Sequence, residues 1–518
     1  MIKKNILLLA ILFYSLFFYS FNITGQNSTK LSWDEIDYVN ASRLGILENI
    51  FEFNSKNIFE HIEYGLTNRN FIIIDENKLT NDQIKNFKQN YLTDDIFELR
   101  HYHPPLLNII ISVYLNINPI ENDPNLIEFK ILYNSMVIFL ILLVLLLILY
   151  NKNSFLNLLN SLIFISIFFI STFYINSINI INYHLLFGLV TLLYVYGFNK
   201  FINKYNYKNL FKLSFFTFLL FFCLETSIFV FFFSIIYYLL FNYSSINQKL
   251  KNLFILCGIS FLFTIFLWPA NLYNLSLIKT YSMYFYRLFI SSFSEYSDLS
   301  IFYQIYNLFL DNIFIAGLTF YLLIIYFIFY KKLKSNLINL VLFISLTYFF
   351  VMIPFMHNLN YLFASILLLI VLCCIIINKV STKYNSHIFL LNTIILTLSI
   401  VNFSNQKTEI YNNDNNIFNH LNENYSDNLY LVDGSHIFEY YSNNHIYFNL
   451  NLYSKNNPKF YIKNDKNYFN VESLIKKKFF DGIIIQSNRK YNENDYKFLY
   501  KNGYKLDNTF DNYLFFYY

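Results

Sequence analysis

Charged residues are scarce in this chain. Only 14% of its 518 residues are Asp, Glu, Lys or Arg, whereas 56% are apolar. A soluble globular protein carries about 25% charged residues, and the mean hydropathy here is positive. Apolar runs of near-spanning length recur along the chain. The composition therefore excludes a set of soluble domains and predicts a polytopic, α-helical membrane protein.

Cysteine and glycine are also scarce, and the net charge is small. The four cysteines, Cys223, Cys257, Cys373 and Cys374, all lie in apolar runs. The hydrophilic parts therefore hold no disulfide framework and no thiolate metal site. A net charge of only +5 reflects membrane topology and argues against a nucleic-acid partner. Ten glycines offer few places for the broken helices that transporters use.

About eleven membrane spans are expected. The first, roughly residues 5–22, follows Lys3 and Lys4 and lacks a small-residue cleavage site, which favours a retained span over a signal peptide. The others cover roughly residues 131–150, 155–172, 183–198, 213–226, 228–243, 253–269, 313–330, 337–354, 362–378 and 387–402.

The lysines of the loops support this order of spans. If Lys3 and Lys4 are cytoplasmic, alternation places most other loop lysines on the same side, as the positive-inside rule requires. They are Lys152, Lys200, Lys204, Lys208, Lys212, Lys249, Lys251, Lys331, Lys332, Lys334, Lys379 and Lys383. The short outer loops hold almost nothing basic except Lys279 and Arg287. We expect the plasma (inner) membrane of a bacterium, with the N-terminus in the cytoplasm.

Three hydrophilic regions then fall on the outer face. Residues 23–130 form a first loop and residues 270–312 a second loop within a membrane domain covering residues 1–402. Residues 403–518 form a small soluble α/β domain. Its expected strands are "NLYLVDG", "HIYFNLNLY", "FDGIIIQS" and "YLFFYY", with helices at 470–479 and 493–502.

The first outer loop begins with the acidic stretch "DEIDYVNASR", residues 34–43. As a helix it places Asp34 and Tyr38 on one face, with Glu35 turned away and Arg43 about two turns further on. A solvated helix start, with acids favoured by the helix dipole, explains these residues equally well.

The same loop ends in "ELRHYHPPLLNIIISVYL", residues 98–115. Arg100, His101 and His103 precede two prolines, which fix an extended entry and the first turn of an apolar helix of about 12 residues. That helix is too short to span and is expected to lie in the membrane interface. Two histidines without a placed third ligand are a weak metal signal, and incidental surface histidines are the plainer alternative.

Taken together, the two stretches resemble the GT-C membrane glycosyltransferases that use polyprenyl-phosphate sugars. The similarity is to the protein O-mannosyltransferase-like and aminoarabinose-transferase-like families. Their first outer loop carries D-E-x-x-Y-x-x-x-[SA]-R and then H/K-P-P-L. The matching residues here are Asp34, Glu35, Tyr38, Ser42 and Arg43, followed by His103, Pro104, Pro105 and Leu106. Lys130 stands where the next span of the family often begins with Arg.

The chain departs from this pattern in three places. The outer loop after the third span has Asn182, Tyr183 and His184 where an Asp is common. Glu225 stands near the outer end of the fifth span, where family members often carry Lys. Asn360-Tyr361 replaces the Arg-Tyr of a late span. Recognition of the donor phosphate must therefore differ from the family pattern.

The resemblance implies an inverting transfer from a polyprenyl-phosphate sugar to an acceptor at the outer face. It makes Asp34 the catalytic base, with Glu35 positioning the acceptor or holding Arg43. The residues expected to bind substrate or the leaving phosphate are Tyr38, Arg43, Arg100, His101, His103, Lys130 and Arg287. A divalent metal is compatible with the family but not required by the sequence. The sugar stays open, and the acceptor could be lipid A, a cell-wall polymer, another glycan or a protein.

Other interpretations stay open. Lys130 could simply snorkel at the end of its span, and Glu225 with Thr226 and Ser227 could form a tight polar hairpin. If Glu225 lies deeper, an acid within the membrane is a functional candidate. A transporter or flippase of lipid-linked sugars is the main alternative function, although the span centres are nearly free of charge. An oligosaccharyltransferase, a polymer ligase or a purely structural membrane protein are further alternatives.

Overall fold

The structure is a computed structural model, and its chain divides into two compact units. The first contains residues 42–55 and 101–410, and the second contains residues 30–41 and 411–518, besides other segments. The residues that the structure describes are 38–39, 42, 45–52, 103–117, 124–149, 155–169, 171, 181–282, 284–285, 306, 309–310, 312–353, 359–406, 414–425, 428–433, 446–450, 461–464, 467–470, 475–486, 493–510 and 513–518. The span expected at 5–22 lies outside them.

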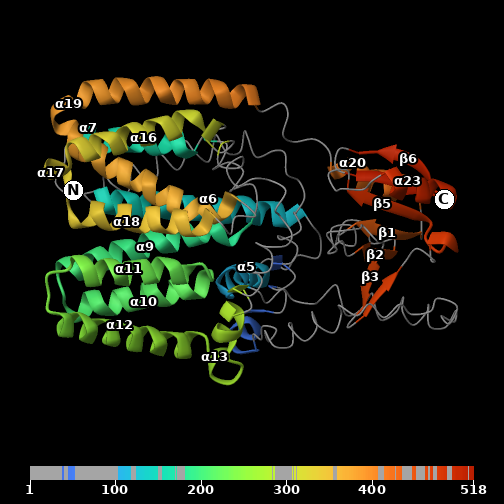
Figure 1. Ribbon diagram of the computed structural model, residues 1–518, viewed down its shortest axis with the longest axis horizontal. Coiled ribbons are helices and arrows are strands. Elements are labelled where there is room, and N and C mark those ends of the chain that lie inside the picture. The colour runs from blue at the N-terminus through green and yellow to red at the C-terminus, as the bar shows by residue number, and fades with distance from the viewer. Residues whose placement is uncertain are drawn as a thin grey trace. The chain divides into compact units, whose positions relative to one another are not determined.

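The first unit is a bundle of helices (Figure 1). Its longer helices are α5 (Leu106–Ile117), α6 (Pro124–Leu149), α7 (Phe155–Phe169), α9 (Tyr183–Asn203), α10 (Tyr207–Cys223), α11 (Ser227–Phe241), α12 (Ile246–Leu267), α16 (Ile313–Ile328), α18 (Asn336–Met352) and α19 (Phe363–Gln406). The short elements are η1 (Glu48–Glu52), α13 (Ala270–Tyr273), α17 (Tyr330–Leu333) and η4 (Leu359–Leu362).

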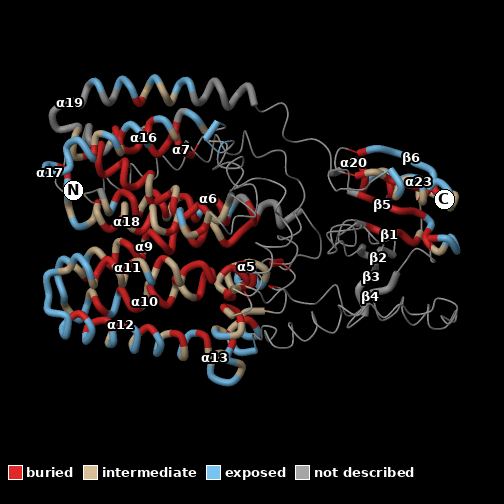
Figure 2. Tube along the Cα trace, viewed as in Figure 1, coloured by how far each residue is buried: buried red, intermediate tan, exposed pale blue. Residues whose placement is uncertain are grey.

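Three helical segments are long and apolar enough to cross a membrane: Tyr183–Asn203, Ile246–Leu267 and Asn360–Val380. Other apolar helices, such as those of α11 and α18, are shorter. Only 28% of the apolar stretch of α12 is buried against protein, and Figure 2 shows exposed positions along this helix. Phe254 and Phe266 are among its exposed residues. An apolar surface of this kind suits contact with lipid. The described part of the chain is thus mostly helical, with three helices that could cross a membrane, whereas the full count of eleven spans stays a prediction.

Short connections make neighbouring helices of the bundle antiparallel. Asn206, Ser245 and Ser335 cap the starts of α10, α12 and α18, each accepting a backbone N–H three residues later. These starts lie beside most of the described lysines, and two lysines bind helix carbonyls there. Lys249 donates to the carbonyl of Leu239 at 2.7 Å, and Lys379 to that of Leu333 at 2.8 Å. We call this end of the bundle the lysine end.

The opposite end contains the start of α9 and the turn between α10 and α11. Residues 224–226 form this turn. The length of α10 separates it from Lys208 and Lys212, which lie near the start of that helix. Figure 1 shows α5 and α13 at this end of the bundle and α17 at the lysine end. We call it the α5 end.

The helix α19 doubles back on itself. Cys374 and Asn392 are eighteen positions apart, which is about 27 Å along a straight helix. Yet Ser161 of α7 donates to the carbonyl of Cys374 at 3.0 Å, and Asn392 donates to the carbonyl of the adjacent Asn160 at 3.3 Å. The two arms of α19 therefore pass the same point of α7, and they correspond to the apolar segments expected at 362–378 and 387–402.

The second unit contains a seven-stranded sheet, in the order β4-β3-β2-β1-β5-β7-β6. The strands are β1 (Leu429–Asp433), β2 (Ile446–Leu450), β3 (Tyr461–Asn464), β4 (Asn467–Asn470), β5 (Gly482–Gln486), β6 (Lys505–Thr509) and β7 (Tyr513–Tyr517). The strand β1 pairs in parallel with β2 and β5, and such central strands read as continuous apolar runs. The helices are α20 (Asp414–Asn424) and α23 (Glu493–Lys501).

All four strands expected in this region are present, as is the helix expected at 493–502. The helix expected at 470–479 is present only in part. Ile475 and Lys476 are helical, and residues 471–474 lie outside the described residues. Asn470 instead ends β4, where its pairing with Tyr461 of β3 keeps it in a strand.

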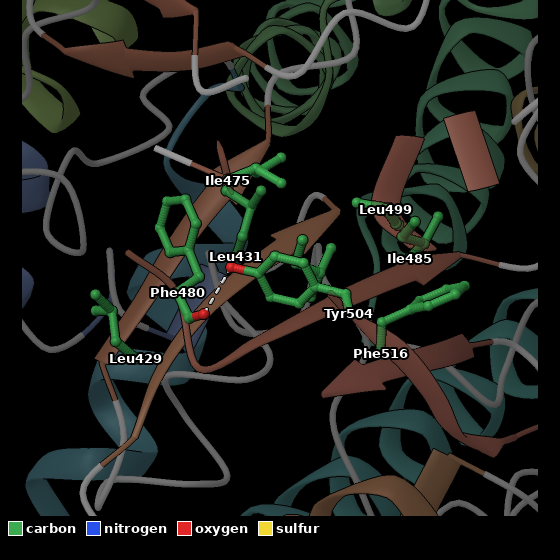
Figure 3. Close-up of a cluster of buried hydrophobic side chains, with 9 residues drawn as sticks. Leu429, Leu431, Ile475, Phe480, Ile485, Leu499, Tyr504 and Phe516 are labelled. Carbon is green, nitrogen blue, oxygen red and sulfur yellow. Dashed lines mark hydrogen bonds between the residues drawn. The ribbon is translucent and has the colours of Figure 1, made fainter. Parts of the chain in front are cut away.

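The core of the second unit gathers around Tyr504 (Figure 3). Its hydroxyl donates to the carbonyl of Phe480 at 2.7 Å, and both residues are fully buried. The other buried members are Leu429, Leu431, Ile475, Ile483, Ile485, Leu499 and Phe516. The sheet and α23 thus close one hydrophobic core with a satisfied polar group inside it.

The close contact between α9 and α19 depends on Gly188. A Cβ there would lie 2.7 Å from the ring of Phe363 and 3.1 Å from Leu367, both fully buried. We expect Gly188→Val to destabilise the detergent-solubilised protein by about 2 kcal/mol, because overpacking forces buried side chains apart. Thermal unfolding measures this. In the control Gly258→Val the new side chain meets open space, and equal losses in the two variants would contradict the packing.

Removing the hydroxyl of Tyr504 should loosen the second unit. Tyr504→Phe leaves the buried carbonyl of Phe480 without its donor, at a cost of about 1–3 kcal/mol. Hydrogen exchange on the full chain should therefore speed up in peptides covering β5. Tyr500→Phe is the matched control, because Tyr500 is 50% exposed. Unchanged exchange in the Tyr504 variant would show that this hydrogen bond does not hold the core.

Candidate functional site

The short helix α5 carries the His-Pro-Pro-Leu stretch at its start. Pro104 and Pro105 are buried, and the carbonyl of Pro105 accepts the N–H of Ile109 at 2.9 Å, so the prolines lead directly into the first helical turn. Leu106 and Ile109 pack against the core formed by Phe218, Phe222, Trp268 and Ala270. The expected apolar helix of 12 residues is confirmed, and its packing fixes where His103 lies.

His103 contacts Glu225, a residue 122 positions away. Its Nδ1 lies 3.0 Å from both carboxylate oxygens. The side chain of Glu225 is 0% exposed, whereas that of His103 is 23% exposed. A buried carboxylate needs a paired donor, because removing it from water otherwise costs several kcal/mol. The Nδ1 contact supplies this buried carboxyl group with a hydrogen-bond partner.

The turn between α10 and α11 holds Glu225 in place. The hydroxyl of Tyr281 donates to the carbonyl of Phe221 at 3.0 Å, and Ser227 Oγ lies 2.8 Å from the same phenol oxygen. Burial raises the pKa of Tyr281 well above its usual value, with Glu225 and Cys223 adding to the rise. Tyr281 is therefore a neutral hydrogen-bond donor at any physiological pH, and it ties the segment after α13 to the turn.

Two aromatic rings flank His103. The ring of Tyr183 lies 4.9 Å from that of His103, and the ring of Tyr284 lies 6.5 Å away, centroid to centroid. Tyr183 also donates to Oδ1 of Asn108 on α5 at 3.0 Å. Burial raises the pKa of Tyr284 well above its usual value, with smaller effects of Tyr361, Glu225 and Tyr348. The histidine thus lies between α9, α5 and the segment after α13.

Ser42, from the stretch at residues 34–43, also contacts α5. Ser112 Oγ donates to the carbonyl of Ser42 at 2.7 Å, and both residues are buried. After Ser42 the chain turns through Gly45, whose φ of +107° suits glycine. Asn49 then donates to the carbonyl of Gly45 at 2.7 Å. The structure therefore brings Ser42 of the first motif and His103 of the second to one helix.

Lys130 lies near the start of α6 and is 5% exposed. Three residues later, the hydroxyl of Tyr133 donates to the carbonyl of Asn182, just before α9. Lys130 is therefore at the α5 end, and its side chain is covered by protein. This burial argues against a lysine that merely snorkels into water.

Several predicted site residues lie outside the described residues: Asp34, Glu35, Arg43, Arg100, His101 and Arg287. Tyr38 is helical and 9% exposed, and it belongs to the second unit. Within the described part of the chain, no group of three or more His, Cys, Asp or Glu could hold a metal ion. The structure thus brings His103 and Lys130 to the α5 end and leaves the catalytic roles of Asp34 and Glu35 as predictions.

The positions that depart from the family pattern gather around His103. Glu225 pairs with it and Tyr183 packs on it, while the ring of His184 meets that of Tyr361 at 4.7 Å. The sequence marks Glu225 as an unusual acid but does not identify His103 as its partner. The predicted topology places Glu225 at the outer end of its span, on the same side as the His-Pro-Pro-Leu loop, and this position was compatible with a contact between them.

Comparison with known proteins adds no relative. No family model matches the chain, and no characterised protein matches it at a significant level.

The link between Ser42 and α5 is testable. Ser112→Ala removes the donor to a buried carbonyl, which should cost about 1–3 kcal/mol locally and speed hydrogen exchange in peptides covering residues 45–52. Ser166→Ala is the control, since Ser166 is also buried but bonds only its own helix at Leu162. If both variants exchange alike, Ser112 does not anchor this segment.

Proposed function

We propose that the chain is a membrane glycosyltransferase of the GT-C type, which moves a sugar from a polyprenyl-phosphate donor to an acceptor at the outer face of the membrane. The observation that supports this proposal is that one residue from each motif lies at α5. Ser112 of α5 donates to the carbonyl of Ser42 in the acidic motif, and His103 of the His-Pro-Pro-Leu motif precedes the same helix.

The distribution of charge supports the outer face. Most described lysines lie at the lysine end, which the positive-inside rule assigns to the cytoplasm. The α5 end is then outside, where a lipid-linked donor presents its phosphate and sugar. Eleven spans, a bacterial inner membrane and an outer α/β domain belong to this proposal.

The chemistry follows from the proposed roles. The acceptor oxygen attacks the anomeric carbon as the bond from that carbon to the phosphate oxygen breaks. Asp34 takes the acceptor proton, and the departing phosphate gains one negative charge. His103, Lys130 and Lys279 are described basic residues at the α5 end that could stabilise this charge, with Arg43, Arg100, His101 and Arg287 as further candidates and Tyr38 as a substrate contact.

A transporter or flippase of lipid-linked sugars is the alternative. Transport across the bilayer usually needs ionisable groups near the middle of the membrane. Among the described residues, the buried charged side chains are Lys130, Glu225 and Lys249, and each lies near the end of a helix. This arrangement favours catalysis at the interface.

Replacing the proposed base tests the reaction. Asp34→Asn should lower sugar transfer at least ~100-fold, because general base catalysis contributes that much or more. The assay uses purified protein in liposomes with a panel of polyprenyl-phosphate sugars and measures release of polyprenyl phosphate. Asp37→Asn is the control, since the family motif leaves that position open. Undiminished transfer by the Asp34 variant would remove Asp34 from the mechanism, and no transfer by the unmodified protein with any donor would favour the transporter.

A further inference from the structure

The helix α12 lies at the edge of the helical bundle (Figure 1) and turns an apolar face away from it. On one side α12 packs against α10 and α11. On the other side Leu250, Phe254 and Phe261 are exposed by 52%, 81% and 61%. Because these positions are four and seven residues apart, they share one face of the helix. We call this face the α12 stripe.

The middle of the α12 stripe is a dip. Gly258 lies four residues after Phe254 and three before Phe261, so the two rings flank it. A Cβ at Gly258 would meet no atom within 4 Å, and the neighbouring Cys257 is also small and exposed. The chain itself therefore leaves a space between two exposed rings, in which a hydrocarbon chain can lie.

Lysines stand at the head of the α12 stripe. Lys251 is exposed three residues before Phe254, and Lys208 and Lys212 are exposed near the start of α10. Both α10 and α12 begin at the lysine end, so they run in the same direction. The stripe thus combines an apolar surface with basic residues at one end of it.

One hydrogen bond sets the depth of these lysines. Ser260 of α12 donates to the carbonyl of Ser214 of α10 at 3.2 Å. Lys251 lies nine residues before Ser260, and Lys208 lies six residues before Ser214. These separations are about 14 Å and about 9 Å along the two helices, so the two lysines differ in depth by only about 5 Å.

The sequence offers these lysines no acidic partner. Between residues 129 and 294 the only Asp or Glu is Glu225, which lies at the α5 end. A surface with lysines and no acids is uniformly positive. It complements a lipid of net negative charge, whereas the ammonium group of a zwitterionic headgroup would find no carboxylate there.

A second copy of the chain would fit this face poorly. Copies of one protein in a membrane share their orientation, so a contact between two α12 stripes would bring Lys251 of one copy against Lys251 of the other. Like charges placed together in this way oppose association. An anionic lipid instead supplies the opposite charge and an apolar chain in one molecule.

We propose that the α12 stripe and the start of α10 form a binding site for an anionic phospholipid. Its phosphate contacts Lys208 and Lys251, Lys212 extends toward it from deeper along α10, and an acyl chain lies over Gly258. Gly258 is seven residues beyond Lys251, about 10 Å along the helix, where acyl chains replace the headgroup region. This site is at the lysine end and does not depend on the proposed function.

Photo-crosslinking tests the site on the full-length protein in phosphatidylcholine nanodiscs. The probes are phosphatidylglycerol and phosphatidylcholine with the same diazirine-bearing acyl chain, each present at the same small fraction. In the unmodified protein, peptides covering residues 251–266 should crosslink to the phosphatidylglycerol probe in clear preference. Removing both lysines, in the double variant Lys208→Gln and Lys251→Gln, should lower this preference about fivefold for each lysine.

The double variant Lys331→Gln and Lys332→Gln is the matched control. It removes the same charge from the lysine end, but these residues belong to α17, which packs against α16 and α19. The control should keep the preference of the unmodified protein.

Three results would overturn the proposal. One is equal crosslinking of α12 by the two probes in the unmodified protein. Another is a preference that the Lys208 and Lys251 variant retains, or that both double variants lose equally. The third is a disulfide between the Cys257 residues of two copies on mild oxidation in the membrane, because it would show that a second copy covers the α12 stripe. The other three cysteines are buried.

Discussion

The contact between Glu225 and His103 is the interaction on which the α5 end of the bundle depends. It joins the turn between α10 and α11 to the loop before α5 across 122 residues. A fully buried carboxylate would be costly alone, so α5 must dock where its preceding histidine can reach it. The packing of Leu106 and Ile109 on the core around Trp268 supplies that docking, and the rings of Tyr183 and Tyr284 enclose the histidine.

The two ends of the helical unit carry different charged residues. At the lysine end, Lys249 and Lys379 bind backbone carbonyls at the ends of helices, where a positive charge also complements the helix dipole. At the α5 end, the buried or partly buried charged groups include Glu225, His103 and Lys130. This difference between the ends supports the proposed interfacial enzyme, because a transporter would usually need ionisable groups near the middle of its helices.

Much of this fold could be predicted from the sequence, because long apolar runs and polar breaks specify helices by themselves. The helix after Pro105 and the strands at "NLYLVDG" and "FDGIIIQS" follow from local pattern. The helix expected at 470–479 is present only in part, because Asn470 belongs to β4, whose pairing with β3 is a tertiary choice. For the same reason the sequence suggested His103 and Lys130 as functional residues but not the partner of His103, since nothing local to Glu225 specifies which loop reaches it.

The central claim is that the phosphate of a lipid-linked donor binds at the α5 end, among the basic residues His103, Lys130 and Lys279. The most direct measurement is a cryo-electron microscopy map of the full-length protein in nanodiscs with a polyprenyl monophosphate bound. The account predicts density for the polyprenyl phosphate within hydrogen-bonding distance of at least one of these residues. Polyprenyl phosphate density at the lysine end, or at the α5 end but away from all three residues, would contradict it.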